Sequence, residues 1–426
     1  MEIEDVGDSF DNQFFRPVDV ALAMATEGRK CEVVSDRDYL RIGIGRCLNE
    51  VASGRGWIQR VRFVMRFLLR VGAYFDNLAS SRRLALVREV GASVVKQLDQ
   101  AAPSGQDPFD KHKELAGFGI YAADGHWHGA SVHEDKVEGK KYAVGGFYAM
   151  NLRTQSMRLL DIARPKNKKE HDITALKRLE SEVLRMGEPT GRKVLIAYDP
   201  AIIDYRQWFK WKMEKGIYIV TREKENSELV CCGLNDKFDR TDPRNNGVIN
   251  DELVGQSNGG FIFRRITFID PVNGKKFVFL TTEMKLQPGL IGFIYKKRWD
   301  IEKVFDEFKN KMHERKSWAK SRDAKCQQAE FMCLAHNLAV ITERRLEEEE
   351  RIIDETNTKR KAKRLEVAQK TPQEAGRSDN PLNSAAYKAV QRTLQFFRWV
   401  ECALISRASW RCAVELYRPI AKQYLQ

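Results

Sequence analysis

Apolar residues recur at three- and four-residue spacing from Ile294 to Met312, after a Pro288-Gly289 pair. At about 100° per residue, the periodic apolar positions fall on one face of a predicted amphipathic helix. These positions are Ile294, Ile301, Val304, Phe305, Phe308 and Met312. Four polar residues gather on the border of that face, within an arc of roughly 60°. They are Tyr295, Arg298, Glu302 and Lys309. The cluster has the composition of a functional site, but a helix with ordinary surface ion pairs such as Arg298–Glu302 has the same pattern.

The first hundred residues have helical periodicity throughout. Helices are predicted over Ser35–Val51, Ile58–Leu78 and Ser81–Leu98, and Ser35 with Asp38 forms a helix-start box. Within Gln59–Arg70, arginines alternate with Val, Phe, Met and Leu. This segment is either a DNA-facing basic helix or a core helix with one solvated arginine edge. Pro, Gly and Ser then mark a linker at 100–108.

The pattern changes to strands after this linker. Strands are predicted at Leu115–Asp124, Lys141–Leu152, Met157–Ala163, Val194–Asp199 and Gly216–Thr221. A bend or bulge is expected at Gly145-Gly146, because glycine interrupts an apolar stretch there. Helices are predicted between the strands at Asp172–Met186, capped by Asp172 or His171, and at Tyr205–Glu214. Strands that alternate with helices indicate an α/β sheet.

From 222 to about 260 the chain is polar and rich in Asn, Asp and Gly. Two strands follow, Phe261–Asp270 and Lys275–Thr282, with an Asn273-Gly274 turn between them that favours a hairpin. Residues 222–280 are therefore interpreted as a β-rich insertion placed before the Glu302 helix.

The chain beyond Met312 is helical again. A long helix is predicted over Asp323–Arg351, then a polar connector over Asp354–Asn380. Aromatic residues at helical spacing in Ala385–Leu425 indicate core or a subunit contact. We divide the chain into a helical N-terminal DNA-binding region (1–108), an α/β core (109–322) and a helical C-terminal region (323–426) that is our first choice for dimerisation.

The net charge indicates the kind of partner that the protein binds, and the cysteine pattern indicates its cellular compartment. The 426 residues carry 73 basic and 59 acidic side chains, a net charge of +14 that suits a polyanion such as DNA. No apolar run approaches the roughly 18 residues needed to span a bilayer, and no secretory signal is visible. The eight cysteines form no C-x-x-C pattern, which predicts reduced thiols in a cytoplasmic protein. Cys326, Cys333 and His336 are interpreted as core residues, because a zinc site there lacks a fourth ligand.

Three acidic residues stand where a sheet site forms. Asp124 and Asp199 each end an apolar strand, and Glu302 lies at the border of a helix that packs on the sheet. Three carboxylates brought together would bind Mg²⁺ or Mn²⁺. Two such ions about 4 Å apart activate a water or 3′-hydroxyl and stabilise the departing oxygen of a phosphodiester. Tyr295, Arg298 and Lys309 would hold the adjacent phosphates.

At these residues the chain resembles the DDE transposases of bacterial insertion sequences, in the cut-and-paste family with a Tyr-x2-Arg-x3-Glu-x6-Lys signature. Tyr295, Arg298, Glu302 and Lys309 match this signature without a gap. The two aspartates match in YAADGHW (Asp124) and LIAYDPAIIDY (Asp199), and His171-Asp172 fits the His-Asp pair that often precedes the intervening helix.

The resemblance implies an RNase H-like core with an inserted β domain, flanked by helical regions. It implies a nucleoid-associated bacterial transposase that binds terminal inverted repeats and target DNA as a homodimer. Its implied reaction is hydrolytic nicking with two Mg²⁺ or Mn²⁺ ions, then strand transfer by the freed 3′-hydroxyl. In relatives that form a DNA hairpin, an aromatic of the insertion, often Trp, stacks a flipped base. Here no Trp lies between Trp211 and Trp299, so Phe261 or Phe263 is the candidate substitute.

Other interpretations remain open at this stage. Asp204 competes with Asp199, and Asp306 could share the edge of Glu302. His126 and His128 form an H-x-H pattern that ligates zinc in amidohydrolase-type hydrolases, or they contact DNA, or they are plain surface residues. A domesticated or inactive transposase-derived DNA-binding protein is a further alternative, although clustered acids beside phosphates do not help a protein that only binds.

Overall fold

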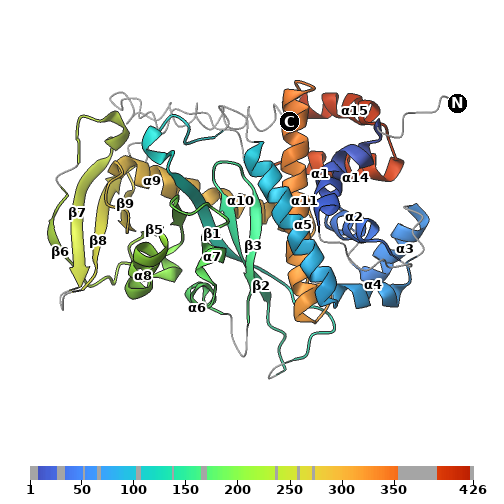
Figure 1. Cartoon of the computed structure of the whole chain (residues 1–426), viewed down its shortest axis with the longest axis horizontal. Helices are drawn as coiled ribbons and strands as arrows, with labels where there is room; N and C mark the ends of the chain where they lie inside the picture. Colours follow the sequence, from blue (N-terminus) through green and yellow to red (C-terminus); the bar gives the residue numbers. More distant parts are fainter. Residues whose placement is uncertain are drawn as a thin grey trace.

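A central β-sheet organises the molecule, with most helices gathered at one end and the strands of the insertion at the other (Figure 1). The computed structural model describes these parts of the chain: 8–25, 34–50, 53–64, 69–101, 107–136, 139–164, 170–235, 238–256, 260–270, 274–353 and 391–422. The predicted connector at 354–380 and most of the predicted linker at 100–108 lie outside them. Among the helices of these ranges, none is long and apolar enough to cross a membrane.

The sheet has nine strands in the order β3-β2-β1-β4-β5-β9-β8-β7-β6. They are β1 (Phe118–His128), β2 (Val144–Asn151), β3 (Met157–Ile162), β4 (Lys193–Ala197), β5 (Ile217–Arg222), β6 (Leu229–Leu234), β7 (Val248–Gln256), β8 (Ile262–Ile269) and β9 (Lys276–Thr281). β1, β4 and β5 run parallel, and β2 and β3 are antiparallel. The expected RNase H-like α/β core is confirmed.

Both faces of the core strands are covered, which explains why their sequences are continuously apolar. Alternate residues of β1 enter different cores: Ile120 and Ala122 pack with the helices on one face, Tyr121 and Ala123 with those on the other. The first face carries α5 (Ser81–Gln100), α10 (Trp299–Asn310) and α11 (Arg322–Glu348), and the second carries α6 (Asp172–Lys177), α7 (Ser181–Leu184) and α8 (Tyr205–Lys215). Asp124 has the parity of Ala122 and therefore belongs to the α10 face.

The insertion does not form a separate sheet. β9 pairs antiparallel with β5, so that Val220 lies opposite Thr281, and β8, β7 and β6 extend the same sheet outward. The predicted hairpin is confirmed as β8 and β9. The sequence analysis did not assign β6 and β7. In β7 a run of polar residues hides the alternation of a strand, whereas β6 is apolar but only six residues long. β6 is the edge strand, and most of its residues are exposed.

Helices make up both flanking regions, as predicted. Those of the N-terminal region are α1 (Phe10–Met24), α2 (Asp36–Cys47), α3 (Gly54–Val64), α4 (Val71–Leu78) and α5 (Ser81–Gln100). Those within the core are α6 (Asp172–Lys177), α7 (Ser181–Leu184), α8 (Tyr205–Lys215), α9 (Pro288–Lys297) and α10 (Trp299–Asn310). The C-terminal region has α11 (Arg322–Glu348), α14 (Leu394–Ser406) and α15 (Trp410–Lys422). Ser35 caps α2 by accepting from the Asp38 N–H at 3.0 Å, so the helix-start box is confirmed.

Two predicted helices are each divided. The helix expected over Ile58–Leu78 is α3 and α4. The one expected over Asp172–Met186 is α6 and α7, because the Arg178 and Leu179 N–H groups bond three residues back and Glu180 starts a new cap. His171 is the N-cap of α6, without a side-chain bond, and Asp172 is its first residue.

The two ends of the described chain pack together. Phe10 of α1 stacks on Trp410 of α15 with ring centroids 5.6 Å apart. Trp399 of α14 contacts the Phe10 ring edge-on, with centroids 5.1 Å apart. The aromatics predicted in the C-terminal region are buried, as expected of core residues: Phe396, Phe397, Trp399, Trp410 and Tyr417.

Candidate active site

The sheet brings Asp124 and Asp199 to the same edge. β1 and β4 are parallel neighbours, and each aspartate lies two residues beyond the paired residues Ala122 and Ala197. Asp199 follows β4 and accepts from the Ala201 N–H at 2.8 Å in a 3-10 turn, Pro200–Ile202. The expectation that Asp124 ends its strand is wrong. β1 continues to His128, because β2 pairs with it as far as Val144.

The predicted helix at 294–312 is interrupted at Arg298. The Arg298 N–H bonds to the Tyr295 carbonyl at 3.1 Å, and the Ile301 N–H bonds to the Arg298 carbonyl at 3.2 Å. These three-residue bonds replace the four-residue ladder and separate α9 from α10. The predicted apolar face is buried at every position. Arg298 thus stands at the junction of two helices above the sheet edge.

Arg298 joins two of the three acidic residues. Its Nη1 lies 3.1 Å from Asp124 Oδ2, and its Nη2 lies 2.7 Å from Glu302 Oε1. The Arg298 side chain is 6% exposed, whereas that of Glu302 is 33% exposed. The pair Arg298–Glu302 exists, but the interpretation of it as an ordinary surface ion pair is wrong, because the guanidinium is buried against Asp124.

The Asp124 carboxyl has a raised pKa, even though Arg298 lies beside it. Burial raises the pKa of Asp124 to about 6, against the lowering effects of Arg298 and of the Gly125 N–H; Asp199 and Asp172 raise it further. A Cβ on Gly125 would lie 3.3 Å from Asp172 Oδ1, and because Gly125 alternates with Asp124 along β1, Asp172 approaches from the other face of the sheet. The sequence analysis used Asp172 only as part of a His-Asp pair and as a helix cap. A buried carboxylate with a raised pKa beside other acids is a donor that a divalent cation would bind.

The three acids are close without being gathered around one point. In the described part of the chain, the carboxylates of Asp124, Asp199 and Glu302 do not all approach within 4.8 Å of one another. The Arg298 guanidinium lies between Asp124 and Glu302 and supplies the positive charge that a metal ion would supply there. It would have to move for ions to bind both carboxylates.

The candidate phosphate-binding residues differ in exposure. Lys309 is exposed, whereas Tyr295 is buried and its ring lies 5.2 Å from that of Phe279. Burial raises the pKa of Tyr295, so its hydroxyl stays protonated and able to donate. A cavity of about 250 Å³ adjoins Tyr295 and is lined by aromatic side chains that include Phe277 and Trp299.

The two phenylalanines proposed to stack a base do not fit equally. Phe263 is buried in the core beneath α8, so its proposed role is wrong. Phe261 is partly buried and packs on Phe209 with centroids 4.5 Å apart. The competing acids are explained otherwise: Asp204 caps α8 through the Gln207 N–H at 2.9 Å, and Asp306 contacts Asn310 and Gln391.

The histidines are not arranged as in an amidohydrolase. His126 and His128 are buried, so the expectation of plain surface residues is wrong. His336 bonds to Glu307 at 3.0 Å, and His313 lies 3.5 Å from Glu50, so neither joins the H-x-H pair. Cys326 and Cys333 are buried free thiols, as predicted for core residues.

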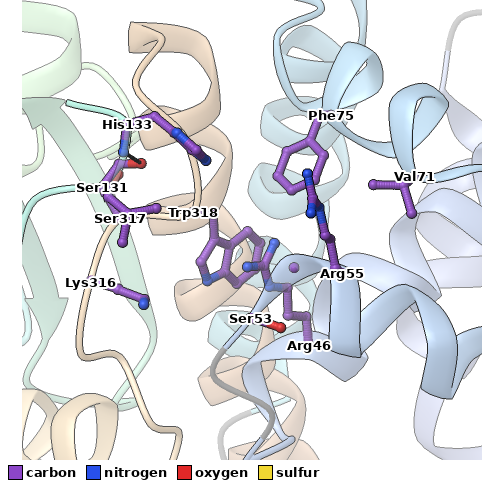
Figure 2. A pocket seen from close by; sticks show the side chains of 12 residues that line it. Arg46, Ser53, Arg55, Val71, Phe75, Ser131, His133, Lys316, Ser317 and Trp318 are labelled. Atoms are coloured by element: carbon purple, nitrogen blue, oxygen red, sulfur yellow. Dashed lines mark hydrogen bonds between the residues drawn. The ribbon is translucent and has the colours of Figure 1, made fainter. Parts of the chain in front are cut away.

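A cavity of about 350 Å³ opens where the N-terminal helices meet the core (Figure 2). Arg46 and Arg55 reach into it from the helical side, and Lys316 from the segment after α10. The Arg46 guanidinium lies 4.2 Å from the centre of the Trp318 ring. The cavity gives the N-terminal region a cationic lining beside the core.

Comparison with known proteins bears on the whole of this arrangement. A family model described as "Transposase DDE domain" matches residues 115–338, more than half of the chain. The matched range includes the sheet, the insertion, α9 and α10. No curated protein matches the chain.

Proposed function

This chain belongs to the transposase DDE domain family, and from that premise we propose that it cuts and joins DNA at the ends of an insertion sequence. In this proposal a dimer binds the terminal inverted repeats, nicks the strands, and transfers the freed 3′-hydroxyls to target DNA. The observation that supports it most directly is the Arg298 guanidinium bridging Asp124 and Glu302 beside Asp199.

Asp124, Asp199 and Glu302 would hold two Mg²⁺ or Mn²⁺ ions. The fit rests on the donor set: three carboxylates, one with a pKa raised by burial and by its acidic neighbours, next to a cation that bridges two of them. When bound, such ions supply an activated water or 3′-hydroxyl and stabilise the departing oxygen.

The cationic side chains then act on the DNA backbone. Arg298, released from the carboxylates, is placed to donate to a phosphate beside the scissile bond. Lys309 lies farther along α10 and is exposed, so it suits a phosphate contact outside the cleavage point. The Tyr295 hydroxyl would donate a hydrogen bond to a phosphate from the buried border of α9 and α10.

The helical regions carry the remaining parts of the proposal. In α3, Trp57, Ile58 and Val61 are buried, while Arg55, Arg62 and Phe63 are exposed. Arg60 pairs with Glu401 at 3.0 Å, and Arg62 Nε donates to the Leu69 carbonyl at 2.7 Å. The helix is thus packed and also presents a basic edge, which supports DNA binding by residues 1–108. Residues 323–426 are proposed to contribute to the dimer.

The test uses the purified full chain and DNA ending in the inverted repeats that flank its gene. With Mg²⁺, we expect nicks at the element ends that leave 3′-hydroxyls, followed by strand transfer. Asp124→Asn, Asp199→Asn and Glu302→Gln should each lower cleavage by about 10³-fold or more, because each removes a ligand, with DNA affinity nearly unchanged.

Asp306→Asn is the matched control, since it removes a carboxylate from the same helix as Glu302 without touching the three acids. Cleavage that survives in any of the three variants contradicts the assignment. Binding without cleavage by the unaltered chain, under conditions that support a related transposase, would favour a domesticated DNA-binding protein.

A further inference from the structure

Beyond the three acids, a second cluster of metal-binding side chains lies in the interior. The atoms that His126, His128 and Glu314 offer to a metal all lie within 4.8 Å of one another. His126 Nε2 is 2.8 Å from Glu314 Oε2, and His128 Nδ1 is 3.6 Å from Glu314 Oε1. Among the described residues, no other group of three His, Cys, Asp or Glu side chains has its ligand atoms within 4.8 Å of one another.

The hydrogen bonds within the protein leave this cluster incomplete. The His128 side chain is 4% exposed, and neither of its ring nitrogens has a hydrogen-bond partner in the described structure. The Glu314 side chain is wholly buried, and its hydrogen bonds with described residues are those to His126 and to the Gln328 amide, whose Nε2 lies 3.3 Å away. A buried imidazole without a hydrogen-bond partner destabilises the fold, so a ligand that uses its lone pair is the natural complement.

We propose that His126, His128 and Glu314 form a buried three-ligand site for a divalent transition-metal ion, with Zn²⁺ as the best candidate and water in its fourth position. Two imidazole nitrogens and one carboxylate are ligands that zinc takes readily, whereas Mg²⁺ and Ca²⁺ prefer oxygen donors alone.

The ligand set differs from that of the proposed catalytic ions. Asp124, His126 and His128 alternate along β1 and point to the same face, so the two sites are neighbours on one strand. Asp124 faces Arg298, whereas His126 stacks on Phe305 with centroids 4.7 Å apart and reaches Glu314. The inference does not depend on the proposed function.

The site would fasten the Asp124 strand to the chain beyond the Glu302 helix. Backbone bonds already join these segments: the Gly129 N–H donates to the Arg315 carbonyl at 3.0 Å, and the Ser317 N–H to the Gly129 carbonyl at 2.8 Å. A Cβ on Gly129 would lie 3.0 Å from that Arg315 oxygen, so a side chain there would push the two backbones apart by a few tenths of an ångström. A metal ion would add a link between side chains of β1 and of the segment after α10, and would fix β1 against α10.

The experiment measures zinc on the tag-free full chain. Protein treated with EDTA and desalted into buffer with millimolar Mg²⁺ is loaded with Zn²⁺, desalted again, and analysed by elemental mass spectrometry and thermal melting. We expect one zinc per chain and a Tm that rises with zinc concentration, because an ion bound only to the folded state stabilises it. Co²⁺ in place of Zn²⁺ should give visible absorption bands with His and carboxylate ligands.

His128→Gln and Glu314→Gln should weaken zinc binding by at least about 100-fold and abolish the zinc-dependent rise in Tm. His133→Gln removes an exposed histidine of the adjoining loop and should keep both effects. Glu302→Gln should also retain zinc, which separates this site from the catalytic carboxylates.

Two results would overturn the proposal. One is an unaltered chain that keeps no zinc after desalting. The other is zinc that remains bound at full stoichiometry in both ligand variants. His128→Leu keeps the test informative if the Gln variants fail to fold: without a metal site it should be as stable as the unaltered chain or more so, because it removes a buried group that has no partner. With a metal site, its Tm should fall below that of the zinc-loaded chain.

Discussion

Arg298 Nη1 lies 3.1 Å from Asp124 Oδ2, although the two residues are 174 positions apart in the chain. This contact joins the helix junction at 298 to the sheet edge and places a buried positive charge where divalent ions are proposed to bind. The guanidinium therefore has two tasks in our proposal: it compensates the acids before metal binding and contacts phosphate afterwards.

The first prediction concerns Arg298→Gln in metal-free protein. Removing the guanidinium leaves Asp124 and Glu302 close together without their counter-charge, so Tm should fall, with a loss on the order of 2 kcal/mol. Ca²⁺ or Mg²⁺ should restore much of the lost stability. Differential scanning calorimetry at pH 8 with EDTA, and then with Ca²⁺, measures both effects. Arg37→Gln is the control, because Arg37 forms an exposed pair with Asp19. Equal loss in both variants, or loss that no ion restores, would contradict the idea.

The second prediction concerns the pH dependence of metal binding. Burial raises the pKa of Asp124 to about 6, so below that pH a proton competes with the ion for this carboxylate. Mn²⁺ affinity, measured by calorimetry from pH 5 to 8, should be nearly constant above pH 7 and fall by up to about tenfold per unit below pH 6. In Asp124→Asn the affinity should be weak at every pH and lose this slope. An affinity for the unaltered chain that is constant across the range would rule out Asp124 as a ligand.

A third prediction separates Lys309 from its neighbour Lys303. Lys309 is exposed on α10, whereas Lys303 lies 2.6 Å from Asp300. Lys309→Ala should weaken binding of element-end DNA and reduce the salt dependence of binding by about one unit of slope, with Tm unchanged. Lys303→Ala should bind DNA as the unaltered chain does. Fluorescence anisotropy at several salt concentrations measures this, and identical slopes in both variants would remove Lys309 from the interface.

A fourth prediction concerns stability and Glu330, on α11. Burial raises the pKa of Glu330 to about 7, although Arg88 at 3.4 Å opposes the shift. Because the folded state holds this proton more tightly than the unfolded chain, the associated stability is full below pH 4.5 and is lost as pH rises through 7. Glu330→Gln should therefore raise stability at pH 8 by about 1–3 kcal/mol and have little effect at pH 5.

Denaturant unfolding at the two pH values measures the effect of Glu330→Gln. Glu349→Gln, at the exposed end of the same helix, is the control and should change stability little at either pH. A gain that is the same at pH 5 and pH 8 would mean that Glu330 is not protonated in the folded state near neutrality.

The sequence predicted the fold where local and tertiary preferences agree. Core strands such as β4 are apolar at nearly every position because helices cover both faces of the sheet, and this burial is visible in the sequence. β7 carries polar residues and β6 is short, and they become strands only through pairing, β7 with β8 and β6 with β7. The division of the helix at 178–180 likewise depends on hydrogen bonds that no local pattern indicates.

The candidate site was predictable to the same degree. The stripe of Tyr295, Arg298, Glu302 and Lys309 follows from helical spacing. The burial of Arg298 does not, because Asp124 arrives from a distant strand. Nor did any signal join Glu314 to His126, since the contact depends on the direction that the chain takes after α10. The burial of Glu307, which the helical pattern placed outside the apolar face, has the same origin.

Glu307 lies on α10 five residues after Glu302 and is wholly buried, with Arg392 Nη1 3.2 Å from its Oε1. The helix that carries Glu302 therefore gains the counter-ion of a buried carboxylate from the far C-terminal side of the chain. During translation, α10 leaves the ribosome some eighty residues before this arginine does. A nascent or prematurely terminated chain that lacks Arg392 would lose this guanidinium and keep the His336 contact to Glu307, at 3.0 Å. The packing of the helix that carries Glu302 therefore depends on a residue that is synthesised after the whole of the sheet.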